Sequence, residues 1–494
     1  MNENTELQKY TMLASFFLPE GMLDWFDVVR MEETDNDNPS HELDVLYPKV
    51  LHIYLDERDT RLGEDLGLRA NGFTEPSVIH DYPARSRKMV LHVRRRRYLD
   101  ADGHSIILCN YPLAAEGTRL SVEFGAFLKM VLDSFPVTCS SVARFFHIKG
   151  STLARNYKES LSDFEGWSQK EHSANWVLLA ANIGGFLSID ETMIGDDVYT
   201  ILSNKDGHGR KGTLVAVVKG TKADVVSRIL LMIPLSEREK VTEVTMDFSD
   251  SMYAIARTCF PNATIVIDCF HIVQRLCEAL DEMRMRFKRL AITKTKKEEA
   301  AWKKQEDGKN KKRAYARKWY EKMTEGKKKP KGKKRGRKRL KKKKWRPTVL
   351  DNGDTLVELL TRARYVLPKS GDKWGEHQKE RADLLFKLYP NLKEAYSLIC
   401  VVRAIFRDKK LTREQARERL HKWYDMVSVC TIREIKSARD CIKAKEEEVL
   451  NYFINRHTNA SAESLNSKIK GFRAQVHGVS DSPFFMYRMC KVFG

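Results

Sequence analysis

Three aspartates directly follow apolar, β-rich runs of the sequence. Asp190 stands behind FLSI, Asp247 behind VTEVTM and Asp268 behind TIVI. An aspartate continues a strand poorly and is costly to bury alone, so these positions predict a site at the ends of strands. Two carboxylates about 4 Å apart repel by about 4 kcal/mol at an effective dielectric of about 20, so a group of them needs a cation or a shared proton. Each aspartate taken singly is more often a turn or cap residue.

A divalent cation is the simplest explanation for carboxylates gathered in one place. Mg²⁺ or Mn²⁺ suits oxygen ligands better than zinc does, and this region lacks a Cys/His quartet. A further acid, Glu463, stands far along the chain in TNASAESLNSKIKGFR. On a helix, Glu463, Asn466 and Lys470 share one face, which offers an oxygen ligand, an amide and a cation. A solvated helix shows the same spacing, and the pattern alone does not favour Glu463 over the acids at 446–448.

The aspartates need a sheet to position them, and residues 176–275 predict one. GFLSID, VYTILSN and GTLVAVVKG are β-rich runs joined by short polar turns, a pattern typical of an antiparallel meander. A helical stretch, the strand VTEVTMDF, a second helix and the strand ATIVIDCF follow. We therefore expect an α/β fold with a mixed five-stranded sheet.

The rest of the C-terminal half reads as helix. From Leu276 apolar positions recur every three or four residues, which predicts an amphipathic helix that runs into a basic segment. Residues 276–455 are expected to form a large all-α insertion. A C-terminal helical segment, 456–494, follows it.

Two smaller regions precede the sheet. Residues 1–118 predict a small α+β module in which Arg94–Arg97 lie on a hairpin closed by DADGH. The four arginines are either a phosphate-contacting ribbon or a solvated strand face. Residues 119–175 are helical, and 138–158 have the outline of a helix-turn-helix.

The second helix of this pair carries the polar residues. Ser151 is a candidate cap for its first turn, and Thr152, Arg155, Asn156 and Lys158 are expected to point outward, where they suit base edges and phosphates. Helical hairpins also occur in proteins that never bind DNA. The pattern alone therefore leaves both interpretations open.

The formal net charge of +21 comes from one segment. Residues 286–346 hold 30 Lys+Arg and 6 Asp+Glu, and 327–344 alone hold 14 basic residues without an acid or an aromatic. This basic tract is a charged linker or an arm that neutralises DNA phosphates, two interpretations that are compatible. The chain has no apolar run of the roughly 18 residues that cross a bilayer, and no secretory signal, so we expect a cytoplasmic protein that does not enter membranes.

Three segments together resemble a known family. SIDET, TMDFSDSMYAIARTCFPNATIVIDCFHIVQ and TNASAESLNSKIKGFRAQVHG resemble the DDE transposases of bacterial insertion sequences, in the ISL-three-like group with its ISAon-one relatives. The resemblance covers roughly residues 120–494, and the first hundred residues more weakly. It implies an RNase H-like catalytic core over 176–275 and 456–494, interrupted by the helical insertion, and it favours the DNA-binding interpretation of the helix-turn-helix.

The resemblance also assigns residues. It makes Asp190, Asp247 and Glu463 the catalytic acids and the ligands of two Mg²⁺ or Mn²⁺ ions. Asp268 and His271 match the family's D-x-F-H signature and take an accessory role, as does Asn466. The residues expected to contact DNA are Arg94, Arg95, Arg96, Arg97, Thr152, Arg155, Lys158, Lys333, Arg335, Lys470 and Arg473.

Two positions depart from the family pattern. Relatives often bind zinc through paired cysteines near the N-terminus, and this chain has no CxxC, so we expect no structural zinc. Ser464 stands where many relatives have a glycine directly after the last acid.

The implied function is that of a transposase that cleaves double-stranded DNA at the ends of an insertion sequence and joins the freed 3′-OH to target DNA. Synapsis of two ends implies at least a homodimer, acting on the nucleoid. Two alternatives remain. One is an RNase H-like nuclease or resolvase that cleaves without joining, and the other is a DNA-binding descendant without catalysis.

Overall fold

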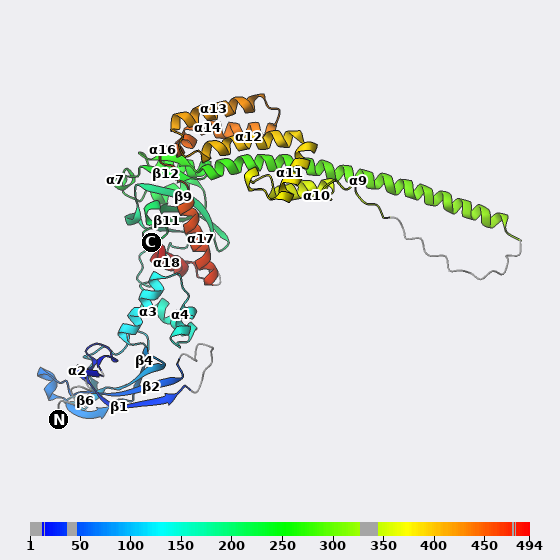
Figure 1. The fold of residues 1–494 in the computed structure, drawn as a ribbon. Helices are drawn as coiled ribbons and strands as arrows, with labels where there is room; N and C mark the ends of the chain where they lie inside the picture. The colour runs from blue at the N-terminus through cyan, green and yellow to red at the C-terminus, as the bar shows by residue number, and fades with distance from the viewer. Residues whose placement is uncertain (1–11, 14, 37–46, 327–343, 477–478, 480) are drawn as a thin grey trace. The chain divides into compact units, whose positions relative to one another are not determined.

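The computed structural model describes residues 12–13, 15–36, 47–326, 344–476, 479 and 481–494 (Figure 1). The chain divides into two compact units. Unit 1 consists of Met1–Val244, Ser249–Ala263 and Asn459–Gly494, and unit 2 of Thr245–Phe248 and Thr264–Thr458. Among the described residues, no helix has the length and apolar character that a membrane crossing requires.

Unit 1 begins with a four-stranded sheet in the order β1-β2-β5-β4, formed by β1 (Phe26–Asp35), β2 (Lys49–Glu57), β5 (Arg87–Arg94) and β4 (Ser77–Ala84). β2 and β5 are parallel, and the other two pairs are antiparallel. Because side chains alternate along a strand, one face carries Ile53, Leu55 and Leu91 into a buried core, closed by the short helix α2 (Met22–Trp25). This sheet and helix lie within residues 1–118, for which the sequence predicts an α+β module, and they belong to the larger unit 1.

A second, three-stranded sheet accompanies it. The strands are β3 (Arg69–Phe73), β6 (Arg96–Leu99) and β7 (Ser105–Ile107), in the order β3-β6-β7. β6 and β7 pair as an antiparallel hairpin around Asp100–His104, so the predicted DADGH turn is confirmed. The expectation that all four arginines lie on this hairpin is wrong, since Arg94 ends β5 of the other sheet, Arg95 lies between the strands, and only Arg96 and Arg97 belong to β6.

A cluster of helices follows, with α3 (Val122–Ser134), α4 (Cys139–Phe145), α5 (Gly150–Asn156) and a π-helical turn, Tyr157–Leu161. Thr138 caps α4, since its hydroxyl accepts the Ser141 amide at 2.9 Å. The prediction of Ser151 as the next cap is wrong: α5 begins at Gly150, Lys149 precedes it without a side-chain cap, and Ser151 lies inside the helix.

The main sheet of unit 1 carries the first predicted acid. Its order is β12-β9-β10-β11-β8, and β9, β10, β11 and β8 are antiparallel to one another in turn. The strands are β8 (Trp176–Leu178), β9 (Phe186–Ile194), β10 (Asp197–Asn204), β11 (Leu214–Lys219) and β12 (Glu243–Met246). The predicted meander is thus confirmed. With β13 (Thr264–Ile267), which lies next to β12, the sheet has six strands: the five that the sequence predicts, and β8.

Helices cover this sheet. They are α6 (Ala223–Leu230), α7 (Leu235–Arg238), α8 (Asp250–Cys259), α17 (Ala460–Gln475) and α18 (Ser482–Phe493). Leu465, Ile469 and Phe472 of α17 pack into one apolar core with Ile201 and Val217 of the sheet. The C-terminal segment is therefore part of the same unit as β9, although more than 260 residues separate them in the chain.

Unit 2 contains β13 (Thr264–Ile267), the neighbour of β12, and a set of helices. The helix α9 (Cys269–Met323) has 55 residues, and its last buried residue is Ala291. Other helices gather along its N-terminal half (Figure 1). They are α10 (Leu356–Arg362), α11 (Glu376–Leu388), α12 (Pro390–Arg407), α13 (Arg413–Val429), α14 (Arg433–Ala444), α15 (Glu446–Leu450) and α16 (Tyr452–Asn455).

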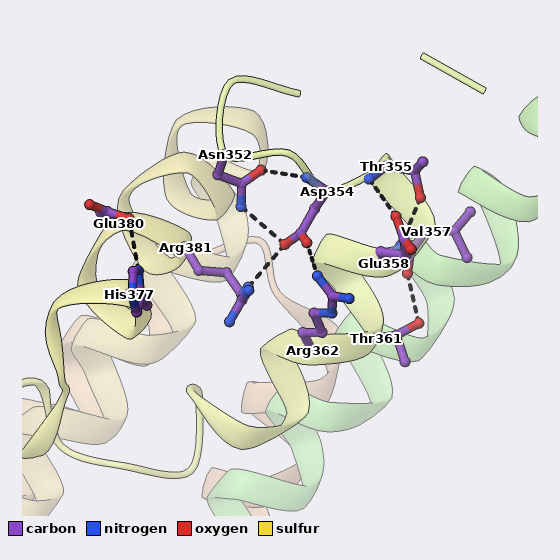
Figure 2. Close-up of polar contacts among 10 residues, drawn as sticks. All are labelled: Asn352, Asp354, Thr355, Val357, Glu358, Thr361, Arg362, His377, Glu380 and Arg381. Carbon is purple, nitrogen blue, oxygen red and sulfur yellow. Dashed lines mark hydrogen bonds and ion pairs between the residues drawn. The ribbon is translucent and has the colours of Figure 1, made fainter. Parts of the chain in front are cut away.

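The buried carboxylate of Asp354 binds side chains of the first two of these helices, α10 and α11 (Figure 2). The side chain of Asp354 is 2% exposed and pairs with Arg362 on α10 and with Arg381 Nε on α11 at 3.0 Å. Asn352 donates to the same carboxylate at 3.0 Å, and Thr355 and Glu358 form a capping box at the first turn of α10. Because the carboxylate of Asp354 binds both α10 and α11 and the turn at Asn352, it stabilises the packing of these two helices against each other.

Candidate active site

Asp190 lies within β9, where it pairs with Ile201 of β10. The expectation that it ends a strand is wrong, since β9 continues through Glu191 to Ile194 and stays paired with β10. Its Oδ1 atom accepts the amide of Glu191 at 2.7 Å, and its side chain is half-buried. The pairing with β10 runs from Leu187 to Ile194 and therefore holds the backbone that carries this carboxylate.

The helix α17 packs on β9 and brings an amide to this carboxylate. Asn466 is 5% exposed, and its Nδ2 atom donates to Asp190 Oδ2 at 2.6 Å. Glu463 lies one helical turn earlier on α17 and is exposed. Unit 1 thus brings Asp190, Asn466 and the turn that carries Glu463 together.

Asn459 is a residue that the sequence interpretation missed. It is fully buried immediately before α17, and its Nδ2 atom donates to the carbonyl of Ile189 at 3.3 Å. This bond fixes the start of α17 next to the residue that precedes Asp190. Its only sequence signal is its place at a helix start, where an asparagine is expected to cap the helix rather than to bind a distant strand.

Unit 2 holds the other predicted residues of the site. Asp247 directly follows β12 and Asp268 directly follows β13, as expected. The Asp268 amide donates to the carbonyl of Met246 at 3.0 Å, and its carboxylate caps α9 by accepting the Phe270 amide at 2.9 Å. His271, in the first turn of α9, places Nε2 2.8 Å from Asp247 Oδ1. Ligand atoms of Asp268 and His271 lie within 4.8 Å of each other.

Each unit, taken by itself, offers carboxylate oxygens, the donor type that a hard divalent ion requires. Asp190 and Glu463 of unit 1 and Asp247 and Asp268 of unit 2 all offer carboxylate oxygens. Cys269 is the nearest thiol in sequence, and burial, followed by the charge of Asp268, raises its pKa to about 11. The thiol is therefore protonated at neutral pH in the metal-free protein.

The four arginines of the N-terminal module differ in their surroundings. Arg94 pairs with Asp56 at 2.5 Å, and Arg95, whose side chain is 14% exposed, pairs with the buried Glu57 at 3.1 Å. Arg96 donates to the backbone carbonyl of Glu57 at 3.2 Å. Arg97 is exposed. Three of the four are thus held by the module's own acceptors, and Arg97 is the most accessible of them.

The side chains of α5, the second helix of the expected helix-turn-helix, do not all point outward as predicted. Arg155 is exposed and Thr152 is half-buried, but Asn156 is 8% exposed, so the expectation that it points outward is wrong. Lys158 lies in the π-helical turn, with its Nζ atom 2.6 Å from Asp481 Oδ2. Its ammonium group thus has an acceptor within the protein.

The remaining predicted DNA contacts lie at the C-terminal helix and in the basic tract. Lys470 is exposed and Arg473 half-buried on α17, beyond Asn466. Lys333 and Arg335 lie outside the described residues.

A comparison with protein families gives one match. A family described as transposase, of the ISL-three-like DDE type, matches residues 187–333 and 333–489, which is more than half of the chain. The matched ranges include all the predicted acids. No curated protein matches the chain at a significant level.

Proposed function

The chain belongs to the ISL-three-like family of DDE transposases, and we propose that it cleaves the ends of an insertion sequence and transfers the 3′-OH ends to target DNA through a two-metal site formed by Asp190, Asp247 and Glu463. Family membership implies DNA binding, use of a divalent metal and an enzyme of DNA transposition and recombination. We further propose that the catalytic core has an RNase H-like fold, that the chain is one of the ISAon-one relatives, and that at least two copies act together.

The hydrogen bond between Asn466 and Asp190 is the observation that carries the proposal. It joins the strand of the first acid to the helix of the last acid, at 2.6 Å. A DDE site needs acids from distant parts of the chain to meet, and this bond supports that requirement for Asp190 and the α17 turn of Glu463. That the carboxylates of Asp190 and Glu463 also come together with the carboxylate of Asp247, in unit 2, is part of the proposal.

The chemistry follows from the donor set. Two divalent ions, when bound, activate the attacking water and stabilise the leaving 3′ oxygen. Asp190, Asp247 and Glu463 would hold these ions. Asn466 fixes the rotamer of Asp190, and His271 fixes Asp247 in the same way, so both act as positioning residues. Lys470 and Arg473, further along α17, would hold the phosphate backbone of the DNA.

The proposal is tested by strand cleavage and by transfer of pre-cleaved ends in the presence of Mg²⁺. Asp190→Asn and Asp247→Asn are each expected to abolish both reactions, because the amide loses the charge that holds the cation. They should bind DNA like the wild type in EDTA. Asp224→Asn, an exposed acid at the start of α6, is the matched control and should keep activity.

The positioning residues should have smaller effects. Asn466→Ala and His271→Ala are expected to lower cleavage by about 10–100-fold, the range for residues that orient metal ligands. Normal cleavage by Asp190→Asn would contradict the assignment of the site. Cleavage without any transfer of pre-cleaved ends would favour the nuclease alternative.

A further inference from the structure

Unit 1 contains a cavity of about 740 Å³ that lies outside the proposed active site. Its floor is the outer face of the N-terminal sheet, where Val50, His80, Lys88 and Val90 share one side of neighbouring strands. The opposite face of the same sheet is the apolar core described above. The other wall comes from the turn between α4 and α5 and from α5 itself. The backbones of the nearby elements β2, β4 and α4 are labelled in Figure 1.

The lining is strongly basic. Lys88, Arg119, Lys149 and Arg155 reach it from four separate segments. Among the lining residues that the structure describes, Asp81 is the single acid, and its carboxylate is buried and accepts the Ser121 hydroxyl at 2.6 Å and the Tyr82 amide at 2.8 Å. Four cations around one volume favour an anion with several oxygen atoms.

Rings and amides complete the lining. Tyr47 and His147 meet edge to face with their ring centroids 4.6 Å apart, and Phe146 lies beside His147. Asn36 and Asn156 belong to the same lining, and Asn36 Nδ2 donates to the carbonyl of Tyr47 at 3.0 Å. Aromatic faces stack on nucleobases, and amides bond their edges. A volume of this size is within the range of about 300–1,000 Å³ for small-molecule sites, and a DNA duplex is too wide to enter it.

This cavity changes the interpretation of the second helix. Thr152, Arg155 and Asn156 of α5 line the cavity and share it with the sheet. A helix that reads a major groove presents these side chains to the duplex instead. Their place in the lining therefore also allows contact with a ligand smaller than a duplex.

We propose that this cavity binds a single nucleotide, with its phosphate among Lys88, Arg119, Lys149 and Arg155 and its base against the rings of Tyr47 and Phe146. The nucleotide is an unpaired one at the end of a DNA strand or a free mononucleotide. The DNA source rests on the proposed function, whereas the mononucleotide source does not.

The first experiment is calorimetric titration of the full-length chain with deoxyadenosine monophosphate in EDTA. Arg155→Ala should weaken binding by about tenfold, the effect of losing one charge-assisted contact. Arg144→Ala is the matched control, since Arg144 is an exposed arginine on the neighbouring helix α4 and does not line the cavity. Circular dichroism of both variants checks the fold. Equal binding by the two variants would overturn the proposal, as would equal affinity for inorganic phosphate and for the mononucleotide.

The second experiment separates the two sources. Two labelled duplexes of one sequence are compared, one blunt and one with three unpaired 3′ nucleotides. If DNA is the source, the overhang increases affinity, and Arg155→Ala or added mononucleotide removes the increase. If the overhang has no effect but the mononucleotide still binds, the site stands as one for free nucleotides. Because no divalent metal is present, the result does not depend on whether Asp190→Asn abolishes cleavage.

His80 provides a spectroscopic readout within the cavity. His80 is partly accessible to solvent, and desolvation by the surrounding protein, followed by the charges of Lys88 and Arg119, lowers its pKa below its usual value. A bound phosphate offsets these charges, so the mononucleotide should raise the pKa of His80 in an NMR titration, with His80→Gln used to assign the signal. A titration curve unchanged by saturating mononucleotide would place the ligand elsewhere and overturn the site.

Discussion

Asp190 and Asn466 are 276 positions apart, yet one hydrogen bond of 2.6 Å joins their side chains. Sequence patterns identified both residues, because an acid behind an apolar strand and an amide at i+3 from Glu463 are local signals. They did not identify the bond, since local patterns carry no information on which helix covers which strand. Asn459 was missed for the same reason, because its partner is the carbonyl of Ile189.

The ion pairs of Asp163 predict a pH dependence at the scale of a single residue. Its carboxylate accepts Lys129 of α3 at 2.5 Å and Lys491 of α18 at 3.0 Å, and these two bonds hold its pKa below the usual value. The folded state therefore releases this proton more readily than the unfolded state. The stabilisation is complete above about pH 5 and is lost as the pH falls through the lowered pKa.

Asp163→Asn should thus lower the unfolding temperature at pH 7 and have no effect near pH 2. The effect should stay below about 1 kcal/mol, because the carboxylate is 60% exposed. Thermal unfolding of both proteins from pH 2 to pH 7 measures it. A difference that grows toward acid pH would contradict the sign of the pKa shift.

At the scale of elements, the strands were easier to predict than the long helix. Each of the five β-rich runs forms a strand, because alternation and turn residues lie within the runs themselves. The three residues of β8 were too short to give such a signal. The helix α9 was predicted from Leu276 onward, but its extent to Met323 was not, since no residue beyond Ala291 is buried and the apolar period ends there.

Gly308 lies within this part of α9 and gives the helix a testable weak point. An added Cβ would meet nothing within 4 Å among the described residues, and glycine costs a helix about 1 kcal/mol relative to alanine. Gly308→Ala should therefore slow amide hydrogen exchange around this position by about fivefold.

Gly353→Ala is the contrasting control for this prediction. Its added Cβ also meets nothing within 4 Å, but its φ of +80° disfavours alanine, so the same substitution should lower stability there. Faster exchange around residue 308 in Gly308→Ala would show that this part of the chain is not helical in solution.

At the scale of the whole molecule, the sequence predicted the order of sheets and helices along the chain better than it predicted which of them pack into one compact unit. The structure groups Asn459–Gly494 with the first 244 residues, because α17 and α18 share an apolar core with the main sheet. This grouping depends on contacts between residues far apart in the chain, which composition and periodicity do not report. The boundaries of the five predicted regions, and the convergence of Asp247 with Asp190 and Glu463, stay predictions.

Charge is also a property of the whole molecule. The tract 327–344, which lies largely outside the described residues, holds 14 of the 88 Lys and Arg residues. Its deletion should weaken binding to all DNA sequences alike and make the affinity depend less steeply on salt concentration, because fewer counterions are released. Binding measured on two unrelated duplexes from 50 to 300 mM salt tests this. A Gly/Ser replacement of equal length is the control for linker length, and a loss confined to one duplex would contradict the prediction.

The helix α9 has a mechanical consequence. Between Ala291 and Met323 it extends about 48 Å, at about 1.5 Å per residue, past its last buried side chain. A helix hydrogen-bonded along its length resists bending, so this part of α9 is expected to move as one rigid segment. A tilt of a few degrees near Ala291 would displace Met323 by several ångströms. The contacts of α10, α12 and α14 with α9 therefore bear on where its far end lies.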